Sequence, residues 1–346
     1  MMRLLGRPHI VGFLRPSPVV RTRKLVVGGL RGLLAAAGLA AIAALSGCVT
    51  RAPLAQTYDG PRELPSALAA RFAYEPEPLV VESDPLRERR RFDVHEIVLP
   101  GVGEPDAEPI SFEYYDVEGD AATPIIVVLP IVNGNLIVSR YFARYFVDQG
   151  WAVAVLDREG DPLDHALEDP EHLIRRNLLD YLRVLDWAEA NPEFDAIGVF
   201  GISFGGMAAV MLAALDDRID AVVAAMAGGD LPYLMTHTSY RSIARQVHRA
   251  LQETGMSRSG MRQRLDELIS TDPLALAPYV DAEDVMLVMT RTDMIVPFET
   301  QQALRARLGR PETLYLPTGH RTSVIYFPLL RSSAYDFFAR QFASPN

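Results

Sequence analysis

Short apolar runs alternate with longer amphipathic stretches from residue 92 to the C-terminus. Segments Phe92–Leu99 and Ile110–Val117 mix apolar and polar positions in a way that predicts two strands of a hairpin. Further strands are predicted at 125–129, 151–156, 196–200, 219–227, Val285–Thr290 and Glu312–Leu316, and helices at 139–149, 171–190, Phe204–Leu215, 299–308 and 322–342. This alternation predicts an α/β fold, with a mostly parallel, twisted sheet and helices on both faces.

One interval between predicted strands is longer than the others. Residues 230–278 carry Met235, Tyr240, Ile243 and Val247 among polar residues, at the spacing of a helix. We interpret this interval as a helical cap insertion that covers a site. A plain packing extension of the fold is the alternative.

The first 47 residues have the composition of a targeting segment. They hold seven basic residues and no acidic ones, and 32–45 is an uninterrupted apolar run. As a helix this run would rise about 21 Å, short of the roughly 30 Å hydrocarbon core of a bilayer. Residues 1–47 are therefore predicted to be a signal peptide, not a membrane-spanning helix.

The apolar run ends in Leu45-Ser46-Gly47-Cys48, which resembles the lipobox of bacterial lipoproteins. The resemblance implies that Cys48 becomes the N-terminus and is acylated, as by palmitate, and that these acyl chains attach the protein to a membrane. We expect a lipid-anchored protein exported to the bacterial cell envelope, with the choice between inner and outer membrane left open.

Residues 48–91 are rich in proline and end in the charged run Arg87-Glu88-Arg89-Arg90-Arg91. This composition predicts an extended Pro-rich tether between the anchor and an α/β domain at 92–346.

Charge and residue usage narrow the chemistry. From Cys48 onward the chain has 27 basic and 44 acidic residues, a balance that repels phosphate backbones and disfavours nucleic acid as a partner. Lys24 is the only lysine and Cys48 the only cysteine. Chemistry that depends on lysine or on a thiolate is thereby excluded from the α/β domain. No metal or organic cofactor is implied.

The motif Gly201-Ile202-Ser203-Phe204-Gly205 lies where a predicted strand meets the predicted helix Phe204–Leu215. A serine on such a sharp turn is raised above the sheet, and the glycines avoid collisions with neighbouring backbone. In this context the motif resembles the nucleophile turn of the α/β-hydrolase superfamily, and the resemblance extends from about residue 92 to the C-terminus.

The resemblance includes the chain order serine, acid, histidine. Asp293 follows a predicted strand and precedes Val296-Pro297, and His320 precedes the last predicted helix. By resemblance, Ser203 is the nucleophile, His320 the general base and Asp293 the residue that orients the imidazole. Asp230, after the strand at 219–227, is the alternative acid.

The same resemblance places an oxyanion hole beside Ser203. One donor is the backbone N–H of Phe204, and the other lies in the loop after the strand at 125–129. Alignment on the strand end favours the N–H of Ile131, while alignment on Asn133-Gly134 favours Asn135. The loop lacks the His-Gly pair that many superfamily members have, which leaves the substrate class open.

We therefore predict a serine hydrolase that cleaves carboxylic esters of a small-molecule or acylated substrate through an acyl-enzyme intermediate. A serine peptidase or amidase of the same fold is one alternative. A non-catalytic lipoprotein that only binds its ligand is another, although an intact serine, acid and histidine set argues against it.

Overall fold

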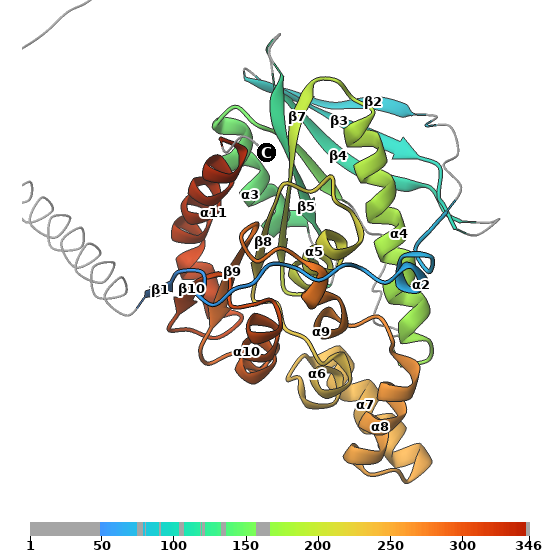
Figure 1. Ribbon diagram of the computed structural model, residues 1–346. Helices are drawn as coiled ribbons and strands as arrows, with labels where there is room; N and C mark the ends of the chain where they lie inside the picture. Colours follow the sequence, from blue (N-terminus) through green and yellow to red (C-terminus); the bar gives the residue numbers. More distant parts are fainter. Residues whose placement is uncertain are drawn as a thin grey trace, which may run out of the picture. The chain divides into compact units, whose positions relative to one another are not determined.

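The computed structural model describes residues 49–343, apart from 75–78, 80, 90, 104–106, 118, 120–121, 133–135 and 157–166. In this part of the chain ten strands form one mixed sheet, in the order β1-β10-β9-β8-β7-β5-β6-β4-β3-β2 (Figure 1). The strands are β1 (Thr50–Ala52), β2 (Glu82–Glu88), β3 (Phe92–Leu99), β4 (Ile110–Val117), β5 (Thr123–Leu129), β6 (Ala152–Leu156), β7 (Phe194–Ile202), β8 (Ala221–Ala225), β9 (Val285–Thr290) and β10 (Glu312–Leu316). The helices are α2 (Ser66–Ala69), α3 (Leu136–Asp148), α4 (Pro170–Glu189), α5 (Phe204–Leu215), α6 (Leu231–His237), α7 (Arg241–Thr254), α8 (Arg258–Leu268), α9 (Pro273–Leu276), α10 (Phe298–Arg307) and α11 (Phe327–Phe342), with short 3-10 turns η1 (Ala277–Tyr279) and η2 (Thr322–Tyr326).

The middle of the sheet is parallel and its two edges are antiparallel. Strands β6, β5, β7, β8, β9 and β10 pair in parallel. Strands β4, β3 and β2 continue the sheet antiparallel on one side, and β1 pairs antiparallel with β10 on the other. The predicted mostly parallel α/β sheet is confirmed. All parallel strands therefore end at the same edge, which is called the carboxyl edge below.

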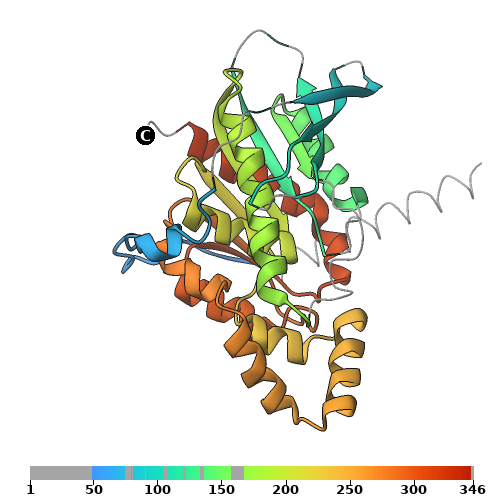
Figure 2. The ribbon, with the colours of Figure 1, turned by 90° about the vertical axis from the view of Figure 1, so that its right-hand side faces the viewer.

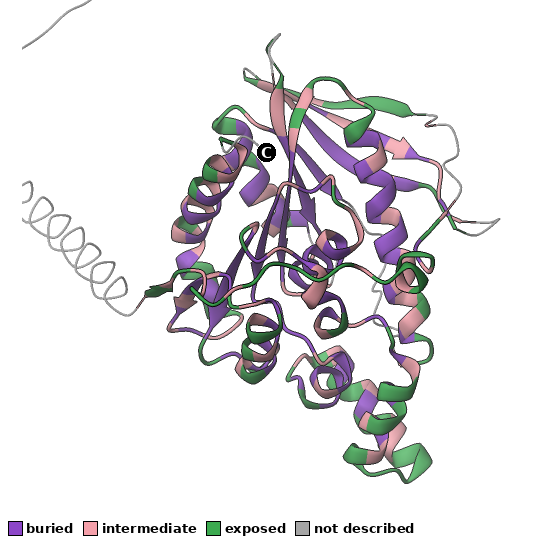
Figure 3. Ribbon diagram, viewed as in Figure 1, coloured by how far each residue is buried: buried purple, intermediate pink, exposed green. Residues whose placement is uncertain are grey.

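Helices cover both faces of the sheet, as predicted. Because successive strand residues face opposite sides, β5 contributes Ile125 and Val127 to one core and Ile126 and Val128 to the other. Helices α4, α5 and α10 pack on the first face, and α3 and α11 on the second (Figures 1 and 3).

The predicted bounds of five elements are observed unchanged: β3, β4, α5, β9 and β10. One helix needs a correction. The segment 322–342 was predicted as a single helix, but it begins with η2, and α11 starts at Phe327. Pro328 lacks a backbone N–H and is tolerated in the first turn of a helix, so the α-helix begins there.

The prediction of a tether over 48–91 is wrong for the described residues of this segment. Strand β1 pairs with β10, and β2 forms an edge of the sheet beside β3. Phe72 is 4% exposed, and the Tyr74 hydroxyl donates to Asp186 Oδ2 of α4 at 2.7 Å. The prolines keep this segment extended, but aromatic side chains between them bury against the body of the fold. Pro85 lies where the register of edge strand β2 shifts, a position that tolerates the missing N–H.

The interval between β8 and β9 is filled by α6, α7, α8, α9 and η1. Helices α7 and α8 project from the rest of the fold (Figure 2) and are largely exposed (Figure 3). Their buried residues are Ile243 and Val247 of α7, and Met261 and Leu265 of α8.

Among the described residues, no helix is both long enough and apolar enough to cross a bilayer. The predicted signal peptide 1–47 and the predicted lipidation site Cys48 lie outside the described residues.

Candidate active site

Ser203 forms the turn between β7 and α5. Its φ of 59° and ψ of −119° are costly for a residue that carries a side chain. The Ser203 N–H donates to the Ala225 carbonyl of β8 at 2.8 Å, and the Met207 N–H donates to the Ser203 carbonyl at 3.0 Å. The neighbouring strand and the first turn of α5 thus hold the strained residue in place.

Both glycines of the serine motif are required by close backbone contacts. A Cβ atom on Gly201 would collide with the backbone carbonyl of Gly205. A Cβ atom on Gly205 would lie 2.8 Å from the carbonyl oxygen of Leu129, the last residue of β5. The turn therefore packs directly against the strand that leads into the predicted oxyanion loop.

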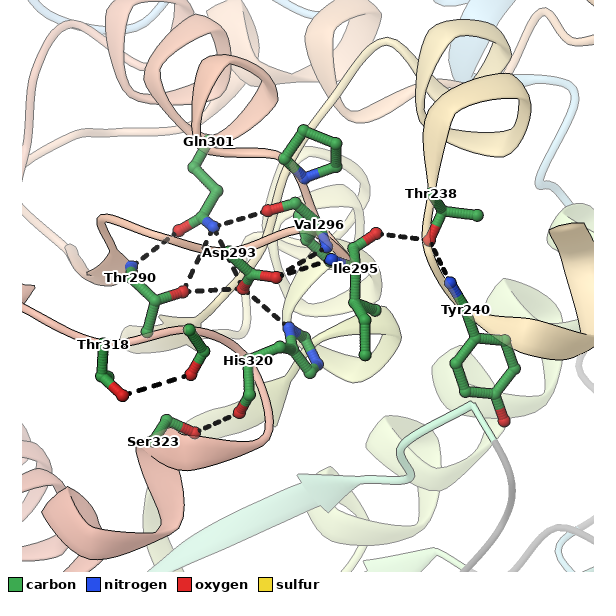
Figure 4. Close-up of polar contacts among 12 residues, drawn as sticks. Thr238, Tyr240, Thr290, Asp293, Ile295, Val296, Gln301, Thr318, His320 and Ser323 are labelled. Atoms are coloured by element: carbon green, nitrogen blue, oxygen red, sulfur yellow. Dashed lines mark hydrogen bonds and ion pairs between the residues drawn. The ribbon is translucent and has the colours of Figure 1, made fainter.

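Asp293 and His320 are brought together from the loops after β9 and β10 (Figure 4). His320 Nδ1 and Asp293 Oδ2 are 2.8 Å apart. The other carboxylate oxygen accepts the backbone N–H groups of Ile295 at 2.9 Å and Val296 at 3.0 Å. The Asp293 side chain is fully buried, and 15% of the His320 side chain is exposed. The carboxylate is thus fixed by its own loop and faces one nitrogen of the imidazole.

Two polar residues that the sequence did not single out complete the surroundings of Asp293. The Thr290 hydroxyl donates to Asp293 Oδ2 at 2.7 Å. Gln301 is completely buried; its side chain accepts the Thr290 N–H at 3.1 Å and donates to the Val296 carbonyl at 2.8 Å. The sequence does not indicate that Gln301 is buried, because a glutamine in the first turn of a helix is ordinarily exposed to solvent.

The loop that carries His320 is braced by its own hydroxyl groups. The Ser323 hydroxyl donates to the His320 carbonyl at 2.6 Å. The Thr322 hydroxyl accepts the Gly319 N–H at 3.2 Å, and the Thr292 N–H donates to the Thr318 carbonyl at 3.1 Å. The acid loop and the histidine loop are therefore hydrogen-bonded to each other through backbone as well as through side chains.

Ser203 and His320 both line a cavity of about 450 Å³ at the carboxyl edge of the sheet. Most of the lining is apolar, and it includes Leu231, Leu234 and Met235 of α6. No described lining residue is aspartate or glutamate. The helical insertion thus contributes to the wall of the cavity that holds the serine and the histidine.

The insertion is also hydrogen-bonded to the acid loop. The Thr238 hydroxyl donates to the Ile295 carbonyl at 2.6 Å, and the Ser239 N–H donates to the Met294 carbonyl at 2.7 Å. Tyr240, the N-cap residue of α7, donates its N–H to the Thr238 hydroxyl at 3.1 Å (Figure 4) and lines the cavity.

The remaining predicted site residues are placed as follows. Phe204 and Ile131 line the same cavity as Ser203, while the alternative donor Asn135 lies outside the described residues. Asp230 caps α6 by accepting the Tyr233 N–H, and it pairs with Arg262 at 2.7 Å. It does not line the cavity, so Asp293 is the acid that the structure pairs with the histidine.

The sheet order, the strained serine turn and the two loops that follow it place this protein in the class of α/β-hydrolase folds. Acetyl xylan esterase 1 from Thermoanaerobacterium sp. is similar in structure, with a TM-score of 0.60 and 16% identity over 80% of this chain and 96% of that chain. An acylaminoacyl peptidase from Pyrococcus horikoshii has a TM-score of 0.54 and 16% identity over 74% of this chain and 42% of that one.

Within this class, residues 73–271, more than half of the chain, match the model of the X-Pro dipeptidyl-peptidase (S15 family). The chain belongs to that family. Two uncharacterized proteins of Mycobacterium tuberculosis, one from each of two strains, are 27% identical over 154 residues, or 44% of this chain. The match spans 35% of the length of these curated relatives.

Proposed function

We propose that this protein is a serine hydrolase that cleaves carboxylic esters, with Ser203 as nucleophile, His320 as general base and Asp293 as the residue that orients it. The observation that carries the proposal is the 2.8 Å contact between His320 Nδ1 and Asp293, beside a cavity that both His320 and the strained Ser203 line.

The geometry supports the following mechanism. Because Asp293 accepts the proton on Nδ1, Nε2 is the imidazole nitrogen left to remove the proton from Ser203. The serine oxygen attacks the ester carbonyl, and the N–H groups of Phe204 and Ile131 are proposed to stabilise the oxyanion. His320 then protonates the departing alcohol, and water cleaves the acyl-enzyme by the same steps in reverse order.

The cavity lining favours an ester with an apolar acyl group. A dipeptidyl-peptidase, the activity in the family's name, acts on a peptide whose N-terminal ammonium enters the site. A buried ammonium needs a counter-charge, and no described residue of the lining is acidic. Apolar side chains from α6 and the loops instead match a hydrocarbon chain. The peptidase remains the alternative, supported by the family match.

A fluorophosphonate probe tests the nucleophile. The wild-type protein should be labelled, Ser203→Ala should not, and the matched control Ser259→Ala, which removes an exposed serine of α8, should be labelled like wild type. Labelling of Ser203→Ala would assign the reactive serine elsewhere, and no labelling of wild type would favour the non-catalytic lipoprotein that only binds its ligand.

Substrate class is tested with p-nitrophenyl butyrate and Ala-Pro-p-nitroanilide, which release related chromophores from an ester and from an X-Pro amide. We expect a higher kcat/KM for the ester. A higher value for the nitroanilide would replace the esterase proposal with a dipeptidyl-peptidase.

A further inference from the structure

Four large apolar side chains are more than half exposed in the described part of the chain. They are Ile137 (72% exposed), Met294 (68%), Val324 (55%) and Ile325 (55%). Isolated exposed apolar residues are common on protein surfaces, but a group of them in one place indicates a surface that is covered in use.

All four residues belong to segments that contribute to the lining of the Ser203 cavity. Val324 itself lines the cavity, and each of the other three is next in sequence to a residue that lines it. They come from three separate parts of the fold: the start of α3, the loop after β9, and η2. We call these four residues the apolar rim. The other large exposed apolar residues, Val81, Leu86 and Met256, are only 41–42% exposed and do not adjoin the cavity lining.

The chain enters the fold at this same edge of the sheet. Strand β1 is antiparallel to β10, with Thr50 opposite Tyr315 and Ala52 opposite Thr313. Strand β10 runs towards the loop of His320, so the beginning of β1 lies nearest the carboxyl edge. Cys48 is two residues before Thr50 in the sequence, within about 8 Å of chain. The predicted lipidation site thus precedes, in the sequence, the point where the chain joins the sheet at this edge.

Two exposed arginines lie on the loops at this edge. Arg321 lines the cavity next to His320, and Arg291 donates to the Thr50 hydroxyl at 3.1 Å. Their charge is complementary to anionic lipid headgroups. An apolar rim with arginines beside it is the composition of a surface that lies in the interface of a bilayer.

We propose that the apolar rim docks on a lipid bilayer and that the cavity takes an acyl ester directly from it. The statement about the substrate rests on the proposed esterase function; the statement about docking does not. Docking would cover the exposed apolar side chains and let a hydrocarbon chain pass from lipid to cavity without crossing water.

The first test compares a dissolved ester with a membrane-embedded one. The full-length protein carrying Ile137→Gln, Met294→Gln and Ile325→Gln is compared with a control carrying Val81→Gln, Leu86→Gln and Met256→Gln. The rim variant should lose at least about tenfold in rate on p-nitrophenyl palmitate in phosphatidylcholine–phosphatidylglycerol vesicles. It should stay within about twofold of wild type on dissolved p-nitrophenyl butyrate, and the control should stay close to wild type on both. Equal losses on the two esters, or none, would overturn the proposal.

The second test does not need catalysis. In the Ser203→Ala protein, an environment-sensitive fluorophore is attached to Ile325→Cys or to Met256→Cys, and the parent protein, which has only Cys48, gives the labelling background. Binding to the same vesicles should shift the emission of the probe at 325 to the blue and leave the probe at 256 unchanged. A shift at 256, or at neither position, would refute docking, even if ester hydrolysis is confirmed. A shift at 325 with no hydrolysis by wild type would instead leave docking standing and refute the esterase.

Discussion

Asp293 is a fully buried carboxylate whose two oxygens are both hydrogen-bonded. A buried charge is costly unless polar partners surround it. Here two backbone N–H groups and the Thr290 hydroxyl replace the hydrogen bonds to water that the carboxylate loses on burial. The imidazole of His320 is a further hydrogen-bond partner. The carboxylate is rigid for this reason, and a rigid carboxylate holds the imidazole in one tautomer.

We expect Ser203→Ala and His320→Ala each to lower kcat by about 10⁴-fold or more without changing the melting temperature appreciably. Asp293→Asn should be nearly as severe, because an amide favours the wrong imidazole tautomer. Hydrolysis of p-nitrophenyl butyrate and thermal unfolding followed by circular dichroism measure the two effects. Near-normal turnover in Asp293→Asn together with its loss in Asp230→Asn would transfer the role of the acid to Asp230.

At the scale of elements, the helical insertion is coupled to the acid loop. The turn between α6 and α7 donates two hydrogen bonds to the loop that follows Asp293, while α6 supplies part of the cavity wall. A side-chain substitution in the insertion can therefore alter the cavity wall directly, because the insertion itself lines the cavity and contacts the acid loop.

Replacing Met235 and Tyr240 with alanine should change the preference among ester chain lengths more than it changes stability. Both residues line the cavity, so their truncation widens the space for the acyl chain. kcat/KM for p-nitrophenyl esters from acetate to decanoate measures the preference, with Met256→Ala, in the turn between α7 and α8, as control. A loss of thermal stability with an unchanged ranking would show that the insertion is a packing extension.

Glu171 joins three elements at the start of α4. Its carboxylate accepts the backbone N–H groups of Ser270 at 2.8 Å and Thr271 at 2.9 Å, and it pairs with Arg71 of the N-terminal segment. Burial alone would raise the pKa of Glu171, but the hydrogen bonds from Thr271 and Ser270 outweigh burial and lower that pKa.

Glu171→Gln should lower the free energy of unfolding by about 2 kcal/mol at pH 7. The folded pKa is below that of the unfolded chain, so this contribution is fully present above about pH 4.5 and is lost as pH falls through the folded value. In denaturant titrations the difference from wild type should therefore be constant from pH 7 down to about pH 4.5 and shrink as the pH is lowered further. Glu253→Gln, on the exposed side of α7, is the control. A difference that is constant with pH would contradict a role for the charge.

At the scale of the whole molecule, the segment after Cys48 is a strap across the fold. It starts beside β10, and the Tyr58 hydroxyl accepts the Ala282 N–H at 2.9 Å. The strap then runs past α2 towards α4 (Figure 1), where the Tyr74 hydroxyl donates to Asp186, and Phe72 is part of the core on this face of the sheet.

Cys48→Ser should abolish acylation and move most of the protein out of the membrane fraction, while the fold from β1 onward is unchanged. Metabolic labelling with a palmitate analogue, followed by membrane fractionation, measures both effects. The fluorophosphonate reaction of Ser203 in the same samples serves as the control for folding. Unchanged acyl labelling of the variant would refute the lipobox assignment.

Local patterns were sufficient to determine most of the fold. Apolar runs, glycines and loop residues predicted β9, β10, α5 and the turn at Ser203, because a buried strand and a tight turn each restrict the residues that they accept. The chain order of Ser203, Asp293 and His320 could also be found in the sequence, since each follows a strand that ends at the carboxyl edge.

Only the tertiary structure decided which distant residues meet. Asp293 and Asp230 both follow strands, and the sequence left either as the acid; the path of the loop after β9 brings Asp293 to His320. Gln301 became part of the surroundings of Asp293 through packing of α10, and the proline-rich segment became a strap because Phe72 joined the core and Tyr74 found a partner on α4. Composition describes how a segment behaves alone, whereas burial depends on the complementary surface that the rest of the chain presents to it.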